Sequence, residues 1–358
     1  MALNPTGSPI KELVESKGAQ GAQEVIREGL KQKKFQPEHF SLQEIWEATC
    51  GPVSQIQEQV VADSFPKITG ELINAKIIAG YDSVAMIGDQ LCTTVPSKLK
   101  TETVAGFTDA EVPDFIPEAG EYNDSTVTEK YVTMRNKKYG KLISITEEMI
   151  LFDQSGQVMT RAQRIGEKAA QYREKTIVEG VQDINSSVWN PSGVATAFYS
   201  ATNGNLATSN AFNEGGLEAV RKLMQQMKDD SEHSDSNDYI LINEANMILL
   251  VPVDLELEAW QMVNSTLTPE SAENASNFFR GRYRVLTSPY VTNQSATTWF
   301  LGDFRQDFWW SEVWPLQTFS RAAGNSDEFK RDIKSMHKVR YYGTIGAVDV
   351  RHSFKSTA

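Results

Sequence analysis

The residue types that most often do chemistry are scattered through this sequence. Neither cysteine has a metal-binding context, because Cys50 and Cys92 form no CxxC pair and stand in unrelated surroundings, so we expect two reduced thiols. No histidine stands in an HExxH or other metal-ligand spacing. The four histidines lie far apart in the chain: His39, His233, His337 and His352.

Motifs for nucleophilic and nucleotide chemistry are also missing. The sequence holds no GxSxG, no GxGxxG and no phosphate-binding loop. Carboxylates are numerous, but no spacing marks a catalytic pair. The acidic stretch 229–238 lacks the central Gly and terminal Glu of a calcium loop, so we interpret it as a solvated loop. We assign no catalytic, cofactor-binding or metal-binding residue, and we expect a protein that is not an enzyme.

Composition and charge fit an ordered protein of two or three lobes. The chain has 358 residues, 40% of them hydrophobic and 23% charged, and a formal net charge of −12. That charge argues against a general nucleic-acid binder. It suits a container whose wall repels the nucleic acid inside it, although ordinary solubility explains it equally well. No apolar run approaches a membrane span of roughly 20 residues, and the first twenty residues lack a secretory core. We expect folding in a cytoplasm and no membrane contact.

Residues 155–184 form the strongest predicted helix. No proline interrupts the segment, and apolar residues recur at steps of four and three: Val158, Ala162, Ile165, Ala169 and Tyr172. At 1.5 Å per residue the helix would be about 45 Å long. Such a rod suits a subunit that spans more than a small globule, but a long core helix of any α+β protein would look the same.

Residues 93–146 predict an oversized hairpin. A strand over 89–96 is followed by a polar excursion through 97–128 and a returning strand over 129–146. Ile143 and Ile145 share one face of the returning strand. A hairpin of this size exposes polar backbone along its edges unless another chain covers it.

The remaining segments predict a mixture of helices and strands, and therefore an α+β fold. Residues 1–64 look like an extended arm with short helices. We predict helices over 66–80 and 214–228 and from Pro252 onward. We predict strands at 239–243, 282–290, 298–304, 308–314 and within 329–354, where Gly343 and Gly346 mark a break.

Three stretches carry a resemblance to a known family. The first runs from Lys138 to Asp153, directly into the helix that starts at Ser155. The second joins Tyr-Ile-Leu-Ile-Asn (239–243) to a Val-Pro step and a helix ending in Asn-Ser (249–265). The third is the charged, β-rich segment 329–350. In this order they resemble the major capsid proteins of tailed bacteriophages with the Hong Kong 97-type fold. They are most similar to the branch related to the Mu-phage major head subunit.

The resemblance covers roughly residues 60–358 and implies a division of the chain. Residues 1–64 would be an N-terminal arm and 93–146 an extended loop. Residues 191–324 would be an axial domain. A peripheral domain with its spine helix 155–184 would take the remaining segments: 65–92, 147–190 and 325–358.

The resemblance also implies function and partners. Hexamers and pentamers of the chain would tile an icosahedral head around double-stranded DNA, without sequence-specific contacts, and the extended loop would lie over a neighbouring subunit. A scaffolding protein, a portal and a decoration protein are the expected partners, and the virion capsid is the expected location. Some relatives crosslink a loop lysine, but no matching motif surrounds the four lysines of this loop, so we expect no crosslink: Lys130, Lys137, Lys138 and Lys141.

Two other readings stay open at this point. An encapsulin-type nanocompartment has the same fold but encloses protein cargo, so the particle content distinguishes it from a phage head. A cytoplasmic α+β enzyme would form small oligomers around a polar pocket, for which the sequence offers no candidate.

Overall fold

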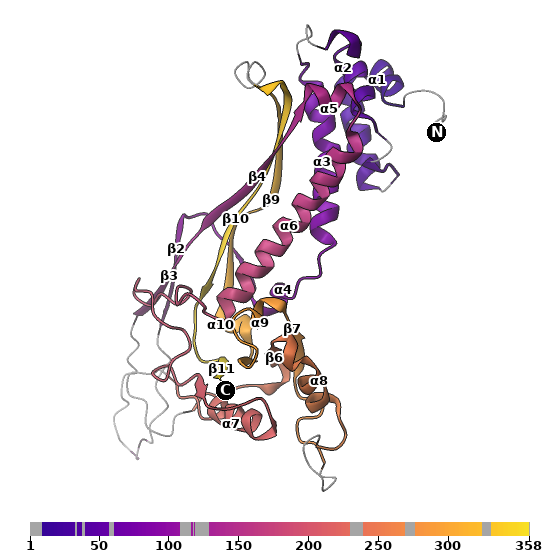
Figure 1. Ribbon diagram of the computed structural model, residues 1–358. Coiled ribbons are helices and arrows are strands. Elements are labelled where there is room, and N and C mark those ends of the chain that lie inside the picture. Colours follow the sequence, from indigo (N-terminus) through magenta and orange to yellow (C-terminus); the bar gives the residue numbers. More distant parts are fainter. Residues whose placement is uncertain are drawn as a thin grey trace. The chain divides into compact units, whose positions relative to one another are not determined.

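The computed structural model describes residues 9–32, 34–37, 40–56, 61–107, 116, 118, 129–229, 239–268, 276–323 and 331–357. The fold is α+β, as predicted (Figure 1). Its α-helices are α1 (Pro9–Lys31), α2 (Leu42–Thr49), α3 (Ser64–Asp82), α4 (Gly88–Leu91), α5 (Glu147–Leu151), α6 (Ser155–Val181), α7 (Glu214–Gln225), α8 (Glu256–Asn264), α9 (Pro289–Thr292) and α10 (Phe304–Asp307). Its strands are β1 (Thr93–Pro96), β2 (Thr101–Phe107), β3 (Glu129–Arg135), β4 (Lys137–Thr146), β5 (Leu206–Thr208), β6 (Ile248–Val251), β7 (Arg284–Thr287), β8 (Trp299–Gly302), β9 (Phe308–Ala322), β10 (Ile333–Ala347) and β11 (Ser353–Thr357).

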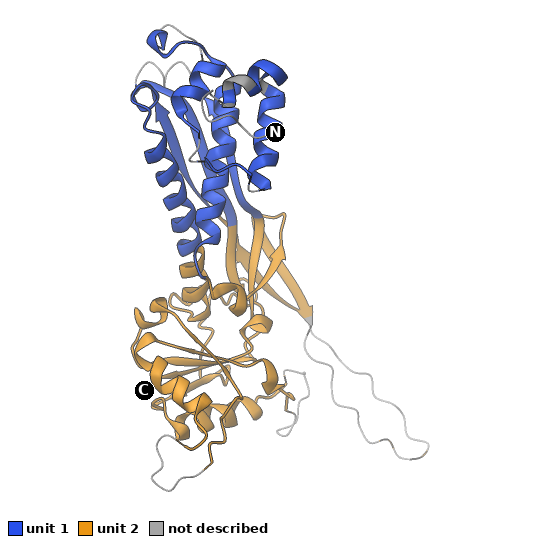
Figure 2. Cartoon of the chain, turned by 90° about the vertical axis from the view of Figure 1, so that its right-hand side faces the viewer, with its two compact units in different colours: residues 1–85, 138–172, 314–342 blue, residues 86–137, 173–313, 343–358 orange. Residues whose placement is uncertain are grey.

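The chain forms two compact units (Figure 2). Unit 1 comprises residues 1–85, 138–172 and 314–342, and unit 2 comprises residues 86–137, 173–313 and 343–358. Three long elements, α6, β9 and β10, contribute residues to both units.

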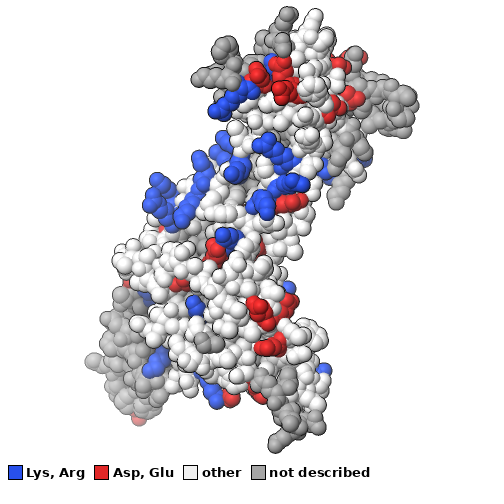
Figure 3. Space-filling model, in the orientation of Figure 1, with Lys and Arg blue, Asp and Glu red and all other residues white. Residues whose placement is uncertain are grey.

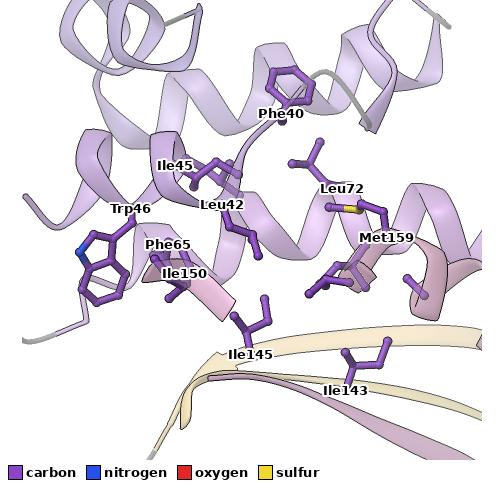
Figure 4. Close-up of a cluster of buried hydrophobic side chains, with 14 of the residues drawn as sticks. Phe40, Leu42, Ile45, Trp46, Phe65, Leu72, Ile143, Ile145, Ile150 and Met159 are labelled. Carbon is purple, nitrogen blue, oxygen red and sulfur yellow. The ribbon is translucent and has the colours of Figure 1, made fainter. Parts of the chain in front are cut away.

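Unit 1 packs a helical layer against a β-sheet in which β10 lies between β4 and β9. The alternation predicted for β4 is confirmed, since Ile143 and Ile145 are buried. In Figure 4 both side chains point from the sheet toward Leu72 of α3 and Met159 of α6. Trp46 of α2 packs edge-on against Phe65 of α3, with ring centroids 5.1 Å apart. One apolar core therefore joins helices and sheet.

Unit 2 is built around a five-stranded sheet in the order β5-β11-β8-β6-β7. All residues of the inner strands β6 and β8 are buried, as expected for strands covered on both faces. On one face Trp299 and Leu301 join the apolar residues of α7 and α8. On the other face the Phe300 ring contacts Tyr199, with centroids 5.5 Å apart.

The helix predicted over 155–184 is confirmed as α6, which ends at Val181. Asp183, just beyond it, has a φ of 51°, in the left-handed region where helices commonly end. Val158 and Ala162 of the predicted stripe are buried in unit 1. Tyr172, the last residue of that stripe, is 47% exposed.

The N-terminal segment differs from the expected extended arm. Residues 9–31 form a helix that is interrupted only at Gly18, where φ is 71°. Ile10 and Ile26 are fully buried in the core of unit 1. Arg27 also donates to Glu71 of α3 at 3.0 Å through Nε. The low density of apolar residues led to the wrong prediction of an extended arm. Two isoleucines, one on each side of the kink, are enough to fix the helix to this core.

Three predicted strands need correction. Tyr239 forms only an isolated bridge, and Leu241 is 96% exposed, so the strand expected at 239–243 is wrong. The next apolar run of the sequence forms strand β6 of the sheet instead, because all four of its side chains can be buried. The segment 89–96 is helical first, as α4, and extended only from Thr93. The strand expected over 282–290 is shorter, as β7, because Pro289 starts α9 after the Ser288 cap.

The break expected at Gly343 and Gly346 is also wrong, because β10 is continuous through both residues. These glycines allow close approach instead. A Cβ at Gly343 would crowd the Trp310 ring and the Ser311 carbonyl oxygen, and one at Gly346 would overlap the Met134 side chain.

Helices α3 and α6 meet through glycine in unit 1. A Cβ added at Gly166 of α6 would overlap the carbonyl oxygen of Ile77, and one at Gly80 of α3 would overlap that of Gln163. Backbone atoms cannot yield as a flexible side chain would. The close helix contact therefore requires these two positions to lack a side chain.

We predict that Gly166→Ala lowers the free energy of unfolding by about 1–3 kcal/mol, because overpacking outweighs the higher helix propensity of alanine. Gly156→Ala, in the first turn of the same helix, is the matched control, since its Cβ would meet nothing within 4 Å. Urea denaturation of the isolated subunits measures both. Equal stability of the two variants would contradict the close-contact account.

Candidate functional site: surfaces for assembly

The base of the long hairpin is fixed by a polar network in unit 2. Strands β2 and β3 pair antiparallel from Thr101 opposite Arg135 to Phe107 opposite Glu129. Asn136, only 4% exposed, donates from Nδ2 to the Leu99 carbonyl oxygen at 2.8 Å and to Ser97 Oγ at 3.2 Å. The Ser97 hydroxyl in turn donates to a Glu102 carboxylate oxygen at 2.6 Å. These hydrogen bonds therefore fix the orientation of the hairpin root.

A second anchor lies on β3. The Ser192 N–H donates to the Tyr131 carbonyl oxygen at 2.9 Å, and the Thr133 N–H donates to the Asn190 carbonyl oxygen at 3.3 Å. Val132 and Met134 on this strand are buried. Most of the tip predicted for this hairpin, 108–115, 117 and 119–128, lies outside the described residues.

The lysines considered as loop amines are exposed on β4. Lys137, Lys138 and Lys141 are exposed, whereas Lys130 on β3 is half-buried. Strand β4 is an edge strand of its sheet, and lysines on an edge oppose unwanted strand pairing. Figure 3 shows Lys and Arg side chains gathered over β4 and α6.

An apolar stripe lies on the surface at the start of α8 in unit 2. Leu257 and Trp260 of α8 are 66% and 59% exposed, and Val253, in the 3-10 turn just before α8, is 47% exposed. The spacing of three residues places Leu257 and Trp260 on one face of α8. A large exposed apolar stripe is typical of a protein–protein contact.

An open apolar pocket of about 470 Å³ lies in unit 1 between β4, β10 and α6. Its wall is aromatic: the Tyr139 ring stacks on Tyr341 with centroids 5.2 Å apart, and its centroid is 5.1 Å from that of Tyr172. Burial and the neighbouring Tyr172 raise the pKa of Tyr139. The full lining is Tyr139, Gly140, Lys141, Ile165, Lys168, Ala169, Tyr172, Val339, Arg340 and Tyr341.

The histidines have structural roles where the structure describes them. His39 and His233 lie outside the described residues. His337 of β10 is 1% exposed, with Nδ1 2.8 Å from Ser320 Oγ and Nε2 3.2 Å from Ser335 Oγ. Burial lowers the pKa of His337 to about 4, so the ring is neutral at pH 7.

His352 forms a cluster that sequence reasoning missed. Its Nδ1 is 3.0 Å from Oδ1 of the fully buried Asp307 and 3.9 Å from Oδ2 of Asp349. Burial lowers the pKa of His352, but the hydrogen bond and charge of Asp307 outweigh it, and the pKa is raised. Although the three side chains could approach one cation, Arg351 already donates to Asp349 at 2.7 Å. We interpret the cluster as an ion pair that ties the turn before β11 to α10.

The comparison that decides the family is a match to a family model described as phage capsid protein, over residues 130–354, which is more than half of the chain. The chain belongs to the phage capsid protein family. No curated protein matches the capsid protein. In the described part of the capsid protein, no helix is both long and apolar enough to cross a membrane.

Solved capsids show the fold. The capsid of a native GTA particle matches with a TM-score of 0.50 and 12% identity, covering 76% of this chain and 90% of that chain. The capsid of the cyanophage P-SCSP1u matches with a TM-score of 0.50 and 12% identity, covering 76% and 88%. These matches show the Hong Kong 97-type fold that the resemblance implied. The family match makes the chain a structural component of a virion shell.

We predict that His337 makes unit 1 sensitive to acid. An unfolded histidine titrates near 6.5 and His337 titrates at about 4, so between these values the unfolded state binds more protons. The free energy of unfolding therefore falls as pH falls through this interval, by up to about 3 kcal/mol. Urea denaturation at several pH values measures the slope. His337→Asn, which keeps a donor toward Ser320, should flatten it, and identical slopes for both proteins would contradict the assignment.

Proposed function

We propose that the capsid protein assembles as hexamers and pentamers into an icosahedral phage head that encloses double-stranded DNA. The observation that carries the proposal is the pairing of β2 and β3. They form a two-stranded sheet of their own, and a two-stranded hairpin is only marginally stable in water. Asn190 and Ser192 already cover part of the β3 edge, and copies of the same chain that cover the remaining edge would stabilise the pair.

The exposed stripe of α8 supports a second contact between copies. Trp260 and Leu257 have the size and exposure of interface anchors, which carry most of their energy when a partner excludes water from them. Hexamers and pentamers require a repeated contact between two different surfaces of one subunit. We assign the α8 stripe to one of these surfaces.

The remaining partners follow from the family. Double-stranded DNA would be held without base-specific contacts, and a net charge of −12 keeps the wall from binding it tightly. A scaffolding protein, a portal and a decoration protein would act with the capsid protein during assembly. We propose a structural role without enzymatic activity, in which residues 93–146 act as the extended loop and 191–324 as the axial domain. The arm 1–64 and the peripheral segments 65–92, 147–190 and 325–358 would complete the subunit.

The content of purified particles separates a phage head from a protein nanocompartment. Electron microscopy of virions should show shells that carry a single portal and tail, and nuclease-resistant long double-stranded DNA should accompany them. Shells that contain only a protein cargo would contradict the phage-head proposal while leaving the fold unchanged.

We predict that the hairpin is needed for assembly but not for folding. Residues 108–128 are replaced by Asn-Gly, which closes the last β2–β3 pair, Phe107 opposite Glu129, with a short turn. The variant should unfold cooperatively like the parent subunit, yet yield no shells by negative-stain microscopy. Shells of normal yield and stability would show that the hairpin has no role between subunits.

We predict that Trp260→Glu blocks assembly without unfolding the subunit. Trp260 is 59% exposed, so the change should alter the free energy of unfolding by no more than about 0.5 kcal/mol. A charge placed in an apolar contact should remove shells. Leu241→Glu is the control, because Leu241 is 96% exposed and lies outside the α8 stripe. If both variants assemble equally well, the α8 stripe is not an interface.

A further inference from the structure

The open pocket of unit 1 combines an apolar wall with a cationic rim. Lys141 and Lys168 are exposed at its margin and Arg340 is half-buried. Every charged residue among those that line the pocket is a cation. The Lys168 ammonium donates to a neutral group, the Gln171 amide oxygen, at 2.7 Å. Arg340 lies over the Trp314 and Phe319 rings, 4.1 and 4.4 Å from their centroids.

The pocket has the size and composition of a binding site. A volume of about 470 Å³ falls within the range of pockets that hold ligands. Tyr172 on its wall is 47% exposed, and Leu142, next to the lining residue Lys141, is 52% exposed. Exposed apolar side chains such as these are stabilised when a partner removes them from water. The chemistry of the pocket therefore calls for an occupant with an apolar centre flanked by negative charge.

The segment between β2 and β3 has this chemistry. The face of α8 that carries Leu257 and Trp260 beside Glu256 and Glu258 has it too, but the proposed function assigns that face to a different contact. Residues 108–128 carry six carboxylates and no lysine or arginine, and an Asp-Phe-Ile-Pro-Glu run (114–118) lies near their middle. The six carboxylates are Asp109, Glu111, Asp114, Glu118, Glu121 and Asp124.

Other acidic segments fit the pocket less well. Residues 229–238 are acidic but hold no large apolar side chain. Residues 324–330 contain acids and Phe329, but also Lys330. The residues that flank this segment are joined by a hydrogen bond from the Ala323 N–H to the Lys334 carbonyl oxygen at 3.0 Å.

We propose that the tyrosine-lined pocket between β4, β10 and α6 binds the 114–118 run of a second copy of this chain. Phe115 enters the apolar centre, and Asp114 and Glu118 meet the cations of the rim. This inference rests on the proposed function, because the second copy is a neighbour in the shell. It goes further by naming the docking site, its anchor residue and the charges that orient it. Charge pairs at the rim set the register and make the contact sensitive to salt.

Crosslinking between two differently marked chains tests the proposal. One chain carries Ala119→Cys, just beyond the 114–118 run, and the other carries Ala169→Cys in the pocket. Both have Cys50→Ser, while Cys92 is left because it is 1% exposed. The two chains are assembled together into DNA-free shells and treated with a short bis-maleimide, which joins two thiols. Thr160→Cys, exposed on the same helix and outside the pocket, replaces Ala169→Cys in the control.

The expected result is covalent dimers from the Ala119→Cys and Ala169→Cys pair and none from the Thr160→Cys control. Shells that form without dimers would overturn the inference and leave the proposed function intact. A chain with both pocket and loop cysteines that links only to itself would also overturn it. The Ala169→Cys thiol could also be protected from the maleimide in DNA-filled heads but not in empty shells. That result would assign the pocket surface to nucleic acid and reject the loop as its occupant. If the unsubstituted chain forms no shell, the proposed function itself fails.

Charge exchange gives an independent readout. Lys141→Glu with Lys168→Glu should reduce shell yield at least about tenfold, because like charges would then face each other. Adding Asp114→Lys with Glu118→Lys should restore it. Arg161→Glu with Arg164→Glu, which changes two exposed cations of α6 that do not line the pocket, should leave the yield unchanged. The proposed charge pairing would be contradicted if both double substitutions lowered the shell yield equally, or if the Asp114→Lys and Glu118→Lys changes did not restore it.

Discussion

Backbone polar groups at the edges of a β-hairpin need partners, and this constraint organises the capsid protein. Strands β2 and β3 satisfy each other along seven paired positions, and a network around Asn136 fixes their root. The pair joins no larger sheet in the part of the chain that the structure describes. Asn190 and Ser192 cover part of the β3 edge. The proposed function assigns the remaining edge to copies of the same chain.

Each of the two units has a core of its own. In unit 1 the glycine contact between α3 and α6 brings two helix backbones together over a sheet that buries Ile143 and Ile145. In unit 2 the fully buried strands β6 and β8 form the centre of a second core. A polar cluster of Asp307, His352 and Asp349, with Arg351 bonded to Asp349, fixes the turn before β11 beside this core. Assembly contacts can be exposed on the surface because each core is complete without them.

Sequence reasoning succeeded where a pattern is local. The apolar stripe of α6 and the alternation of β4 come from side-chain periodicity, which a single segment determines. It failed where tertiary packing decides. Ile10 and Ile26 gave too weak a stripe to predict α1, and the run at 239–243 looked like a strand although Leu241 is 96% exposed. The pocket was out of reach because Tyr139, Tyr172 and Tyr341 come from three separate elements. Asp307 and His352 are separated by 45 residues, and no spacing rule connects them.

Hydrogen–deuterium exchange of the β2 and β3 amides, compared between free subunits and assembled shells, tests the central claim most directly. If neighbouring copies cover the hairpin, its amides should exchange more slowly in the shell than in the free subunit, where only the hairpin root and part of β3 are anchored. The amides of β6 and β8, buried in both states, serve as the internal reference. Equal protection of the hairpin in both states would contradict the dependence of this arm on neighbouring copies.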